Sequence, residues 1–431
     1  MKIIDTETAI IGGGASGLAA AIAASRYGCG NVTIFEKMQR VGKKILSTGN
    51  GCGNETIFGK MQRVGKKILS TGNGRCNLTN RNITPSDYTG DTELLSYISP
   101  DIDNAEDFFS SLGLICRADD NGRVYPYSNA ATSVLDALRF AADSSGIRTV
   151  CDFTVSEITK TKHGFIITNG ETQVKAKRVI IAAGGKAAPS LGSSGEGYEL
   201  CRSLGHSVTR LFPALAPVRT DIELVKSLKG LRVTADATLI SGGRVIDRQS
   251  GEVQFTDGAL SGICIFNLSA KAAEYINNGE ISLDTAPTLS KDELYGLIKS
   301  TAEIRASLPC EGLLTGIYHK RVGQAMLKKA GIPFSETCGE ISDKDISVLC
   351  NLAKDSRYPI RNVSDWSLAQ ITCGGIPASE VSDKLESLKA SGLYLCGEIL
   401  NIQGKCGGYN LDWAWKSGYT AGMNASLSLS E

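Results

Sequence analysis

The residues best placed for chemistry are three glycines close to the start of the sequence. Gly12, Gly14 and Gly17 form a G-x-G-x-x-G pattern. It follows an apolar run over residues 3–11, which predicts a buried strand, and precedes an alanine-rich stretch over residues 18–24, which predicts a helix. Dinucleotide-binding folds use this order, because the glycines permit a tight turn, backbone contact with a pyrophosphate and close packing of helix on strand. We therefore predict a nucleotide cofactor whose phosphates lie at the start of this helix.

An acidic side chain ends the next predicted strand. Residues 32–36 read VTIFE, and Glu36 lies 19 residues after Gly17. In dinucleotide folds an acid at about this distance accepts hydrogen bonds from ribose hydroxyls. We expect Glu36 to bind the adenosine ribose.

The segment that contains this strand occurs twice. Residues 29–51 and 52–74 agree at 21 of 23 positions, and they differ only where Val32 and Glu36 of the first copy are replaced by Glu and Gly. A charge and a glycine weaken a buried strand, so the first copy is the better candidate for the sheet.

The second copy alone runs directly into Arg75-Cys76-Asn77. We predict a hybrid, in which the first copy supplies the strand and Glu36, and the second supplies the loop before Arg75. About 23 residues between them would then bulge at the surface, where insertions cost little. The alternative keeps the loop of the first copy and expels residues 52–74. Limited proteolysis should cut the expelled stretch.

A second glycine-rich element lies late in the sequence. Residues 392–398 predict a strand that ends in Gly397 and Glu398, residues 404–410 a tight loop, and residues 413–425 a helix. The N-terminus of this helix can bring a positive dipole to a flavin ring, whereas an NAD-only dehydrogenase needs no such returning element. The alternative is a glycine-rich surface turn.

The composition argues against several other functions. Lys plus Arg total 46 and Asp plus Glu 45, so a net charge of +1 gives no cationic surplus for nucleic acid. The 13 cysteines form no C-x-x-C or C-x-x-x-x-C pair, so we expect reduced thiols and no metal site. The apolar residues 9–24 are too few for a membrane span and follow acids, so we expect no signal peptide and a cytoplasmic protein. No Ser/His/Asp set has an interpretable spacing, which leaves hydrolase chemistry without support.

The remaining patterns predict a composite α/β architecture. Residues 130–144 have helical spacing, residues 149–158 and 164–168 alternate like strands, and residues 179–185 read as an apolar strand ending in Gly-Gly. Short strand-like runs then fill residues 208–268.

Helical patterns follow this β-rich region. Ser290 caps one predicted helix, residues 322–330 form another, and residues 341–354 form a third with Ser342 as its cap. The predicted division is a nucleotide-binding domain in two parts (1–205 and 371–431), an inserted β domain in two parts (206–287 and 356–370), and a helical insertion (288–355).

Several longer motifs resemble a known family. Residues 65–80 (GKKILSTGNGRCNLTN) resemble the G-R-K-x-x-x-S-G-G-G-R-C-N-x-T-N signature of a bacterial NAD(P)/FAD-dependent flavoprotein family. That family includes a 3-dehydro-bile-acid Δ4,6-reductase and aminoacetone-oxidase-like proteins. The resemblance implies a Rossmann-like FAD-binding domain in two parts, with an inserted β-barrel-like domain that carries a small helical insertion. Further matching segments lie at residues 122–138, 182–198, 251–269 and 392–422.

The resemblance also implies which residues hold the FAD. It places Gly12, Gly14, Ser16 and Gly17 at the phosphates and Glu36 at the ribose, with Gly397 and Glu398 near the ribitol and pyrophosphate. The duplication leaves open whether Gly49 or Gly72, and Gly51 or Gly74, serve the flavin loop. The other expected cofactor-binding residues are Ala15, Lys37, Gly72, Gly74, Arg75, Cys76, Asn77, Val155, Ala183, Gly184, Gly185, Gly408, Tyr409 and Asn410.

Three of these residues are also candidates for catalysis. Arg75 can supply a local cation for a diphosphate or a reduced flavin. Cys76 is a candidate thiol, but a buried small hydrophobe is the preferred interpretation, and for Tyr409 it is packing. The sequence favours a core role for Trp413 and Trp415.

The predicted function is that of an FAD-dependent oxidoreductase in which flavin N5 exchanges hydride with a small or steroid-like substrate. The resemblance points to an NAD(P)H-linked reductase of a conjugated C=C bond. One G-x-G-x-x-G leaves no separate nicotinamide domain, so NAD(P)H would visit the flavin transiently. The alternatives are an oxygen-dependent amine oxidase of the aminoacetone type and a non-catalytic binding protein of the same fold.

Overall fold

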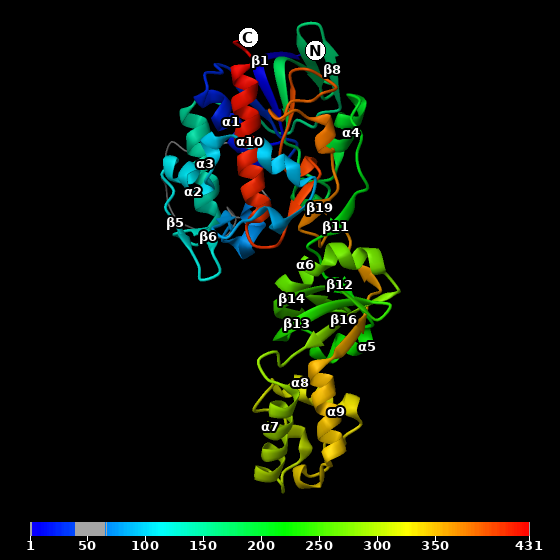
Figure 1. Cartoon of the computed structure of the whole chain (residues 1–431). Helices are drawn as coiled ribbons and strands as arrows, with labels where there is room; N and C mark the ends of the chain where they lie inside the picture. Colours follow the sequence, from blue (N-terminus) through cyan, green and yellow to red (C-terminus); the bar gives the residue numbers. More distant parts are fainter. Residues whose placement is uncertain (1, 39–64, 66, 431) are drawn as a thin grey trace, which may run out of the picture. The chain divides into compact units, whose positions relative to one another are not determined.

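The chain divides into two compact units, which are described separately. The computed structural model describes residues 2–38, 65 and 67–430 (Figure 1). Unit 1 contains Met1–Phe212 and Ile371–Glu431, and unit 2 contains Pro213–Gln370. The finer division into the five segments predicted from the sequence stays a prediction.

Unit 1 is built on a seven-stranded sheet with the order β7-β2-β1-β10-β9-β8, and β20 pairs with β10. The five strands β7, β2, β1, β10 and β20 pair in parallel, and β9 and β8 continue the sheet antiparallel. All four residues of β2 are buried, as expected for a strand covered on both faces. The strands are β1 (Lys2–Ile11), β2 (Val32–Phe35), β7 (Arg148–Val150), β8 (Glu157–Thr161), β9 (Gly164–Thr168), β10 (Thr172–Ile181) and β20 (Leu393–Leu395).

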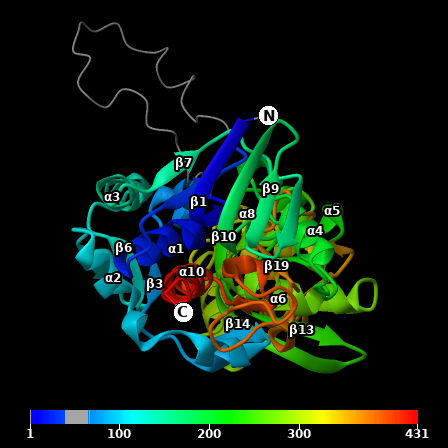
Figure 2. The same ribbon diagram turned by 90° about the horizontal axis from the view of Figure 1, so that it is seen from above.

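The helices α1 (Ala15–Arg26) and α10 (Tyr409–Leu427) lie side by side against β1 and β10 (Figure 2). Their contact uses residues without bulky side chains. A Cβ on Gly418 would lie 2.2 Å from the carbonyl oxygen of Ser16, and one on Gly422 would lie 2.1 Å from that of Ala20. Both contacts advance by four residues, so the two helices run parallel. The first and last helices of the chain therefore form one layer.

Smaller elements complete unit 1. A three-stranded sheet has the order β3-β6-β5, and β4 pairs with β21. The remaining helices are α2 (Ala105–Ser111), α3 (Ala131–Ser144) and α4 (Glu196–Ser203), and the 3₁₀ helix before Arg75 is η1 (Ile68–Gly74). The small strands are β3 (Thr79–Asn80), β4 (Tyr88–Gly90), β5 (Cys116–Ala118), β6 (Arg123–Pro126) and β21 (Ile402–Gly404), and β11 (Phe212–Ala214) and β19 (Ile371–Cys373) lie at the unit limits.

Unit 2 combines one antiparallel sheet with helices. The sheet order is β17-β16-β13-β14-β15-β12-β18, and its closure into a barrel stays a prediction. Ser290 and Ser342 are the N-caps of α7 and α9, as predicted, and the structure shows a capping box at each. The strands are β12 (Val218–Arg219), β13 (Arg232–Ser241), β14 (Arg244–Phe255), β15 (Ala259–Ser261), β16 (Gly279–Asp284), β17 (Ser356–Pro359) and β18 (Asn362–Val363), and the helices α5 (Ile222–Val225), α6 (Ile263–Ala272), α7 (Lys291–Ile304), α8 (Lys320–Ala330) and α9 (Asp343–Lys354).

Two expected elements differ from the structure. The strand predicted over residues 149–158 is wrong in its middle, because the backbone turns at Asp152 with a φ of +58° and leaves the sheet until β8. The helix predicted to begin at Trp413 begins at Tyr409, since Gly408 adopts a left-handed conformation and serves as the N-cap. No helix in the described part of the chain is long and apolar enough to cross a membrane.

Candidate cofactor site of unit 1

The turn between β1 and α1 requires its glycines. Gly12 has a φ of +105°, and a Cβ there would lie 2.5 Å from the carbonyl oxygen of Ala182. A Cβ on Gly17 would lie 1.9 Å from the carbonyl oxygen of Gly12, so helix and turn are in contact. Above Gly14 a Cβ would meet nothing within 4 Å, and α1 has neither a side-chain cap nor an acid in its first turn. The start of α1, including Ala15, thus has the amides and the space that an anionic group needs.

Glu36 lies against this turn. Its carboxylate accepts hydrogen bonds from the backbone N–H of Gly13 at 2.8 Å and of Met38 at 2.9 Å. A carboxylate has lone pairs beyond these two, so Glu36 keeps the capacity to accept from a ribose hydroxyl. Lys37, also expected at the cofactor, forms an ion pair with Glu196 at 2.8 Å.

Both halves of the predicted hybrid lie among the described residues. The strand of the first repeat copy is β2 in the central sheet, and the loop of the second copy is η1, which leads into Arg75. Residues 39–64 and 66, where the expelled stretch was predicted, lie outside the described residues. Gly72 and Gly74 have φ values of +56° and +83°, so this loop needs glycine at both positions.

Lys67, which the sequence prediction missed, reaches the late glycine element. Its ammonium lies 2.9 Å from the carboxylate of Glu398, and both side chains are largely buried. The other oxygen of Glu398 accepts the backbone N–H of Thr372 at 2.8 Å. A signal was present, because Lys67 stands inside the motif that was matched to the family. Its partner, however, lies 331 residues away.

The strand β10 ends in residues that pack around Thr372. A Cβ on Gly185 would lie 2.3 Å from the Thr372 hydroxyl oxygen, and this oxygen accepts the backbone N–H groups of Lys186 and Ala187. Gly184 has a φ of +70°, and Ala183 packs against Gly197 of α4. These residues shape the turn that follows the central strand. Val155, expected at the cofactor, is buried in the core between β7 and β8.

The early and late glycine turns are in direct contact. A Cβ on Gly397 would lie 2.5 Å from the hydroxyl oxygen of Ser16. Gly397 donates its N–H to the Ser417 hydroxyl at 2.9 Å, and its carbonyl accepts from the Trp413 indole at 3.0 Å. Trp413 and Trp415 are both buried, as predicted. Segments almost 400 residues apart in sequence therefore meet at the start of α1.

The loop before α10 leaves one buried acceptor without a partner. A Cβ on Gly408 would lie 2.9 Å from Oδ1 of Asn77, and this oxygen is buried with no hydrogen-bond donor among the described atoms. The Asn410 side chain closes the loop by accepting from the N–H of Gly404 and donating to its carbonyl, both at 2.8 Å. An unpaired buried carbonyl is costly, so Asn77 is suited to accept a hydrogen bond from a ligand at the start of α10.

The side chains of the three catalytic candidates differ in burial and in their contacts. Cys76 is fully buried, and burial raises the pKa of its thiol to about 12, which agrees with the interpretation as a buried hydrophobe. Tyr409 is half-buried and packs edge-on against Tyr88, and burial raises the pKa of its phenol. The guanidinium of Arg75 lies over the ring of Tyr125, 4.7 Å from its centroid.

The parallel helices have staggered starts. Ser16, in the first turn of α1, faces Gly418, which is ten residues after the N-cap Gly408 of α10. Ser16 is itself two residues after the N-cap Gly14 of α1, so at 1.5 Å per residue the start of α10 lies about 12 Å beyond the start of α1. Two helix N-termini pointing the same way at this separation suit an elongated ligand with a diphosphate at one and a polar ring at the other. The residues present therefore fit a dinucleotide.

The structure also assembles a Ser–His–Glu set that sequence spacing did not reveal. His206 Nε2 lies 2.7 Å from the Ser387 hydroxyl, and Nδ1 lies 2.8 Å from the Glu380 carboxylate. Ser387 is buried and its oxygen already accepts the backbone N–H groups of Lys389 and Ala390, so its proton goes to His206. Burial lowers the pKa of His206. This set links the segment after α4 to residues 380–387, and its His206 and Ser387 are both buried.

These features define an FAD-binding domain of the Rossmann class, and the predicted α/β fold class is confirmed. The chain belongs to the family described as HI0933-like protein Rossmann domain, which matches residues 53–424. An NAD(P)-binding Rossmann-like domain also matches residues 10–58. The family resemblance stated from the motifs is therefore confirmed.

Full-length relatives fall into two groups. The chain is 34% identical over 425 residues to the 3-dehydro-bile acid delta(4,6)-reductase of Clostridium scindens, covering 97% of this chain and 98% of the relative. It is 24% identical over 435 residues to the ribosomal RNA dihydrouridine synthase of Haemophilus influenzae, covering 98% of both chains. A solved 3-ketosteroid delta1-dehydrogenase from Sterolibacterium denitrificans has 14% identity and a TM-score of 0.49, covering 98% of this chain and 100% of that one.

Proposed function

We propose that this protein is an FAD-dependent oxidoreductase that reduces a conjugated C=C bond of a small organic substrate. The observation that supports it best is the contact of Gly397 with Ser16, which unites the two glycine turns at the start of α1. The name of the 34% identical bile-acid reductase supports the reaction type. When bound, the flavin supplies hydride exchange at N5.

The residues of this chain bind and orient the cofactor. The amides at the start of α1 hold the diphosphate, and Glu36 accepts from the ribose hydroxyls while it keeps its bonds to Gly13 and Met38. The start of α10 stabilises negative charge on the ring, and Oδ1 of Asn77 accepts a hydrogen bond there. Lys67 and Glu398 link η1 to the turn after β20, which fixes the separation of the two ends of the site.

Among the three catalytic candidates, Tyr409 is the one that can give up a proton. Its raised pKa keeps the phenol protonated near neutral pH, and the side chain is only partly buried. The Cys76 thiol is enclosed by protein, and Arg75 does not release its proton. Tyr409 is therefore the proposed donor to the substrate carbon after hydride transfer.

The ribosomal RNA relatives suggest a different substrate, and the charge distribution favours the small molecule. Residues 288–355 contain nine Lys or Arg and nine Asp or Glu, and the whole chain has a net charge of +1. Neutralising a phosphate backbone requires a cationic surplus.

Flavin content and substrate reduction test the proposal. The purified protein should be yellow and release FAD on denaturation. NADH or NADPH oxidation should accelerate when a 3-oxo-4-ene steroid is added, and unmodified ribosomal RNA should not produce this acceleration. Peroxide formation from an amine without NAD(P)H would support the oxidase instead, and a colourless protein that does not take up FAD would support a binding protein.

A further inference from the structure

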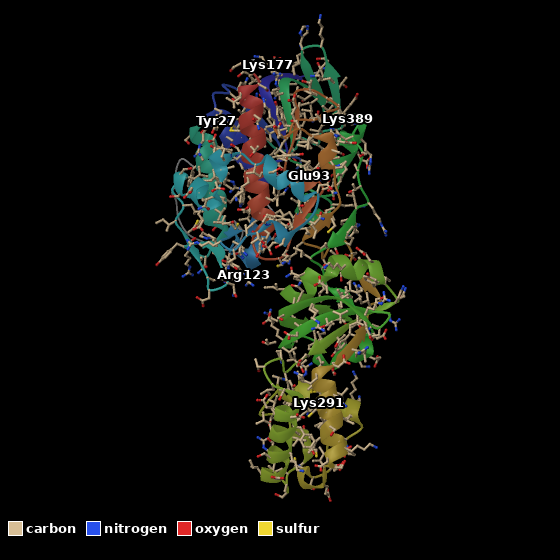
Figure 3. All side chains as sticks on the ribbon, viewed as in Figure 1. Tyr27, Glu93, Arg123, Lys177, Lys291 and Lys389 are labelled. Carbon is tan, nitrogen blue, oxygen red and sulfur yellow. The ribbon has the colours of Figure 1, made fainter. Side chains whose placement is uncertain are left out.

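One face of the sheet β3-β6-β5 carries arginines beside the predicted flavin-ring loop. Arg123 and Tyr125 alternate along β6 and so point to the same face, and Arg117 of β5 lies directly opposite Tyr125. Arg75 stacks on Tyr125 from η1. Figure 3 labels Arg123 on this part of unit 1. We propose that Arg123, with Arg75 and Arg117 beside it, forms a subsite for an anionic group of the substrate.

Arg123 lies next to the loop that precedes α10. Its Nε would lie 3.9 Å from a Cβ on Gly407, and the ring of Tyr409 would lie 3.3 Å from the same Cβ. Its charge also acts on Tyr409 and on Cys406, because it lowers the pKa of both side chains against the larger effect of burial. Arg123 is therefore beside the proposed proton donor and not on a remote surface.

The three arginines have no acidic partner within ion-pair distance in the described part of the chain. The carboxylate of Asp119, in the turn between β5 and β6, accepts the backbone N–H groups of Asn121 and Arg123 at 2.9 and 3.0 Å. Arg123 is half-buried, and a half-buried guanidinium with unused donors favours an anion. Arg81, which directly follows β3, differs from these three arginines because it forms an ion pair with Glu106 at 2.8 Å.

The tyrosines hold two of the guanidinium groups in place. Arg75 lies 4.7 Å from the centroid of Tyr125, and Arg117 lies 5.6 Å from that of Tyr127. A stacked guanidinium keeps its N–H groups free at the edge, and these can bind a carboxylate in a bidentate geometry. Three arginines suit one or two negative charges.

This inference rests on the proposed function and narrows its substrate to an acid. The structure assigns an unsaturated organic acid whose C=C bond reaches the flavin while its carboxylate binds at Arg123. A carboxylate and a phosphate share this chemistry, so a phosphorylated small substrate would bind in the same way. Ribosomal RNA would need many such contacts along its backbone.

The test compares an acid with its neutral ester. The probes are a 3-oxo-4-ene steroid with a carboxylate side chain and the methyl ester of the same compound. Dissociation constants are measured on the flavin-loaded protein from the change in flavin absorbance, and KM from NAD(P)H oxidation. We expect the protein to prefer the acid, and Arg123→Gln to weaken acid binding roughly 10- to 100-fold, the range for a charge-assisted hydrogen bond. Ester binding and flavin content should not change.

Two further variants keep the result interpretable. Arg123→Lys retains the charge without the bidentate geometry and should lose less affinity than Arg123→Gln. Arg244→Gln removes an exposed arginine of β14 in unit 2 and should leave both probes unaffected. Equal binding of acid and ester, or an unchanged preference in Arg123→Gln, would overturn the subsite even if the enzyme reduces both. RNA binding that depends on Arg123, without acid binding, would also overturn it. Failure of the proposed function would be distinguishable from failure of the subsite, because the protein would then contain no flavin or would reduce neither probe.

Discussion

The Cα of Gly418 lies so close to the backbone of Ser16 that a Cβ on the glycine would be 2.2 Å from the serine carbonyl oxygen. This contact sets the stagger of α1 and α10 and thereby the spacing of the two helix starts.

Gly418→Ala should therefore disrupt the site from a distance. The added methyl group meets backbone that cannot rotate away, so the helices must separate, at a cost of about 1–3 kcal/mol or more. We expect a lower melting temperature and a weaker affinity for FAD. The matched control is Gly296→Ala on α7, where a Cβ meets nothing within 4 Å. That change should leave flavin binding intact and raise stability slightly, since alanine favours a helix.

Glu36→Gln should weaken FAD binding with little loss of fold. The amide offers one acceptor oxygen where the carboxylate offers two, so it can keep only one of the bonds to Gly13 and Met38. A loss of about 1–3 kcal/mol in cofactor affinity is expected. Titration of the apoprotein with FAD measures it, and an unchanged affinity would place the ribose elsewhere.

The repeated segment offers a paired experiment with identical local sequence. Lys67→Met should reduce thermal stability and FAD retention, because Glu398 is left largely buried without its ion-pair partner, at a cost of about 1–2 kcal/mol. Lys44 occupies the same place in the first copy. Under the hybrid arrangement Lys44→Met should have no effect on either measurement. The reverse pattern would show that the first copy supplies the loop.

Stability should fall on mild acidification because of His206. Burial lowers the pKa of this side chain in the folded protein relative to its ordinary value of 6.5. Below about pH 6.5 the unfolded chain takes up a proton that the folded chain resists, so the free energy of unfolding decreases until the lowered pKa is reached. Melting temperatures between pH 8 and 5 test this. In His206→Gln the decrease should be smaller, and an equal decrease in both proteins would assign it to other groups.

The sequence predicted those parts of the site and of the fold that depend on neighbours in the chain. In the site these are the glycine turn and the acid after β2, and in unit 2 they are the N-caps Ser290 and Ser342. Each uses residues a few positions apart, so their spacing encodes their geometry. Composition and motifs likewise sufficed for the fold class.

The parts that sequence did not predict arise from contacts between distant segments. The Lys67–Glu398 ion pair and the His206–Glu380–Ser387 set have no local pattern, because tertiary packing alone brings their members together. The break at Asp152 was missed for another reason. An aspartate tolerates a positive φ, but nothing in its neighbours requires one.

The pairing of α1 with α10 determines the stage of synthesis at which the cofactor site can be completed. A nascent chain that has reached residue 400 already contains the first glycine turn, yet the small-residue surface of Ser16 and Ala20 is still uncovered, because Gly418 and Gly422 have not been made. The cofactor site is therefore completed only after α10 has been synthesised, and we expect a chain truncated before Tyr409 to be unable to retain its nucleotide.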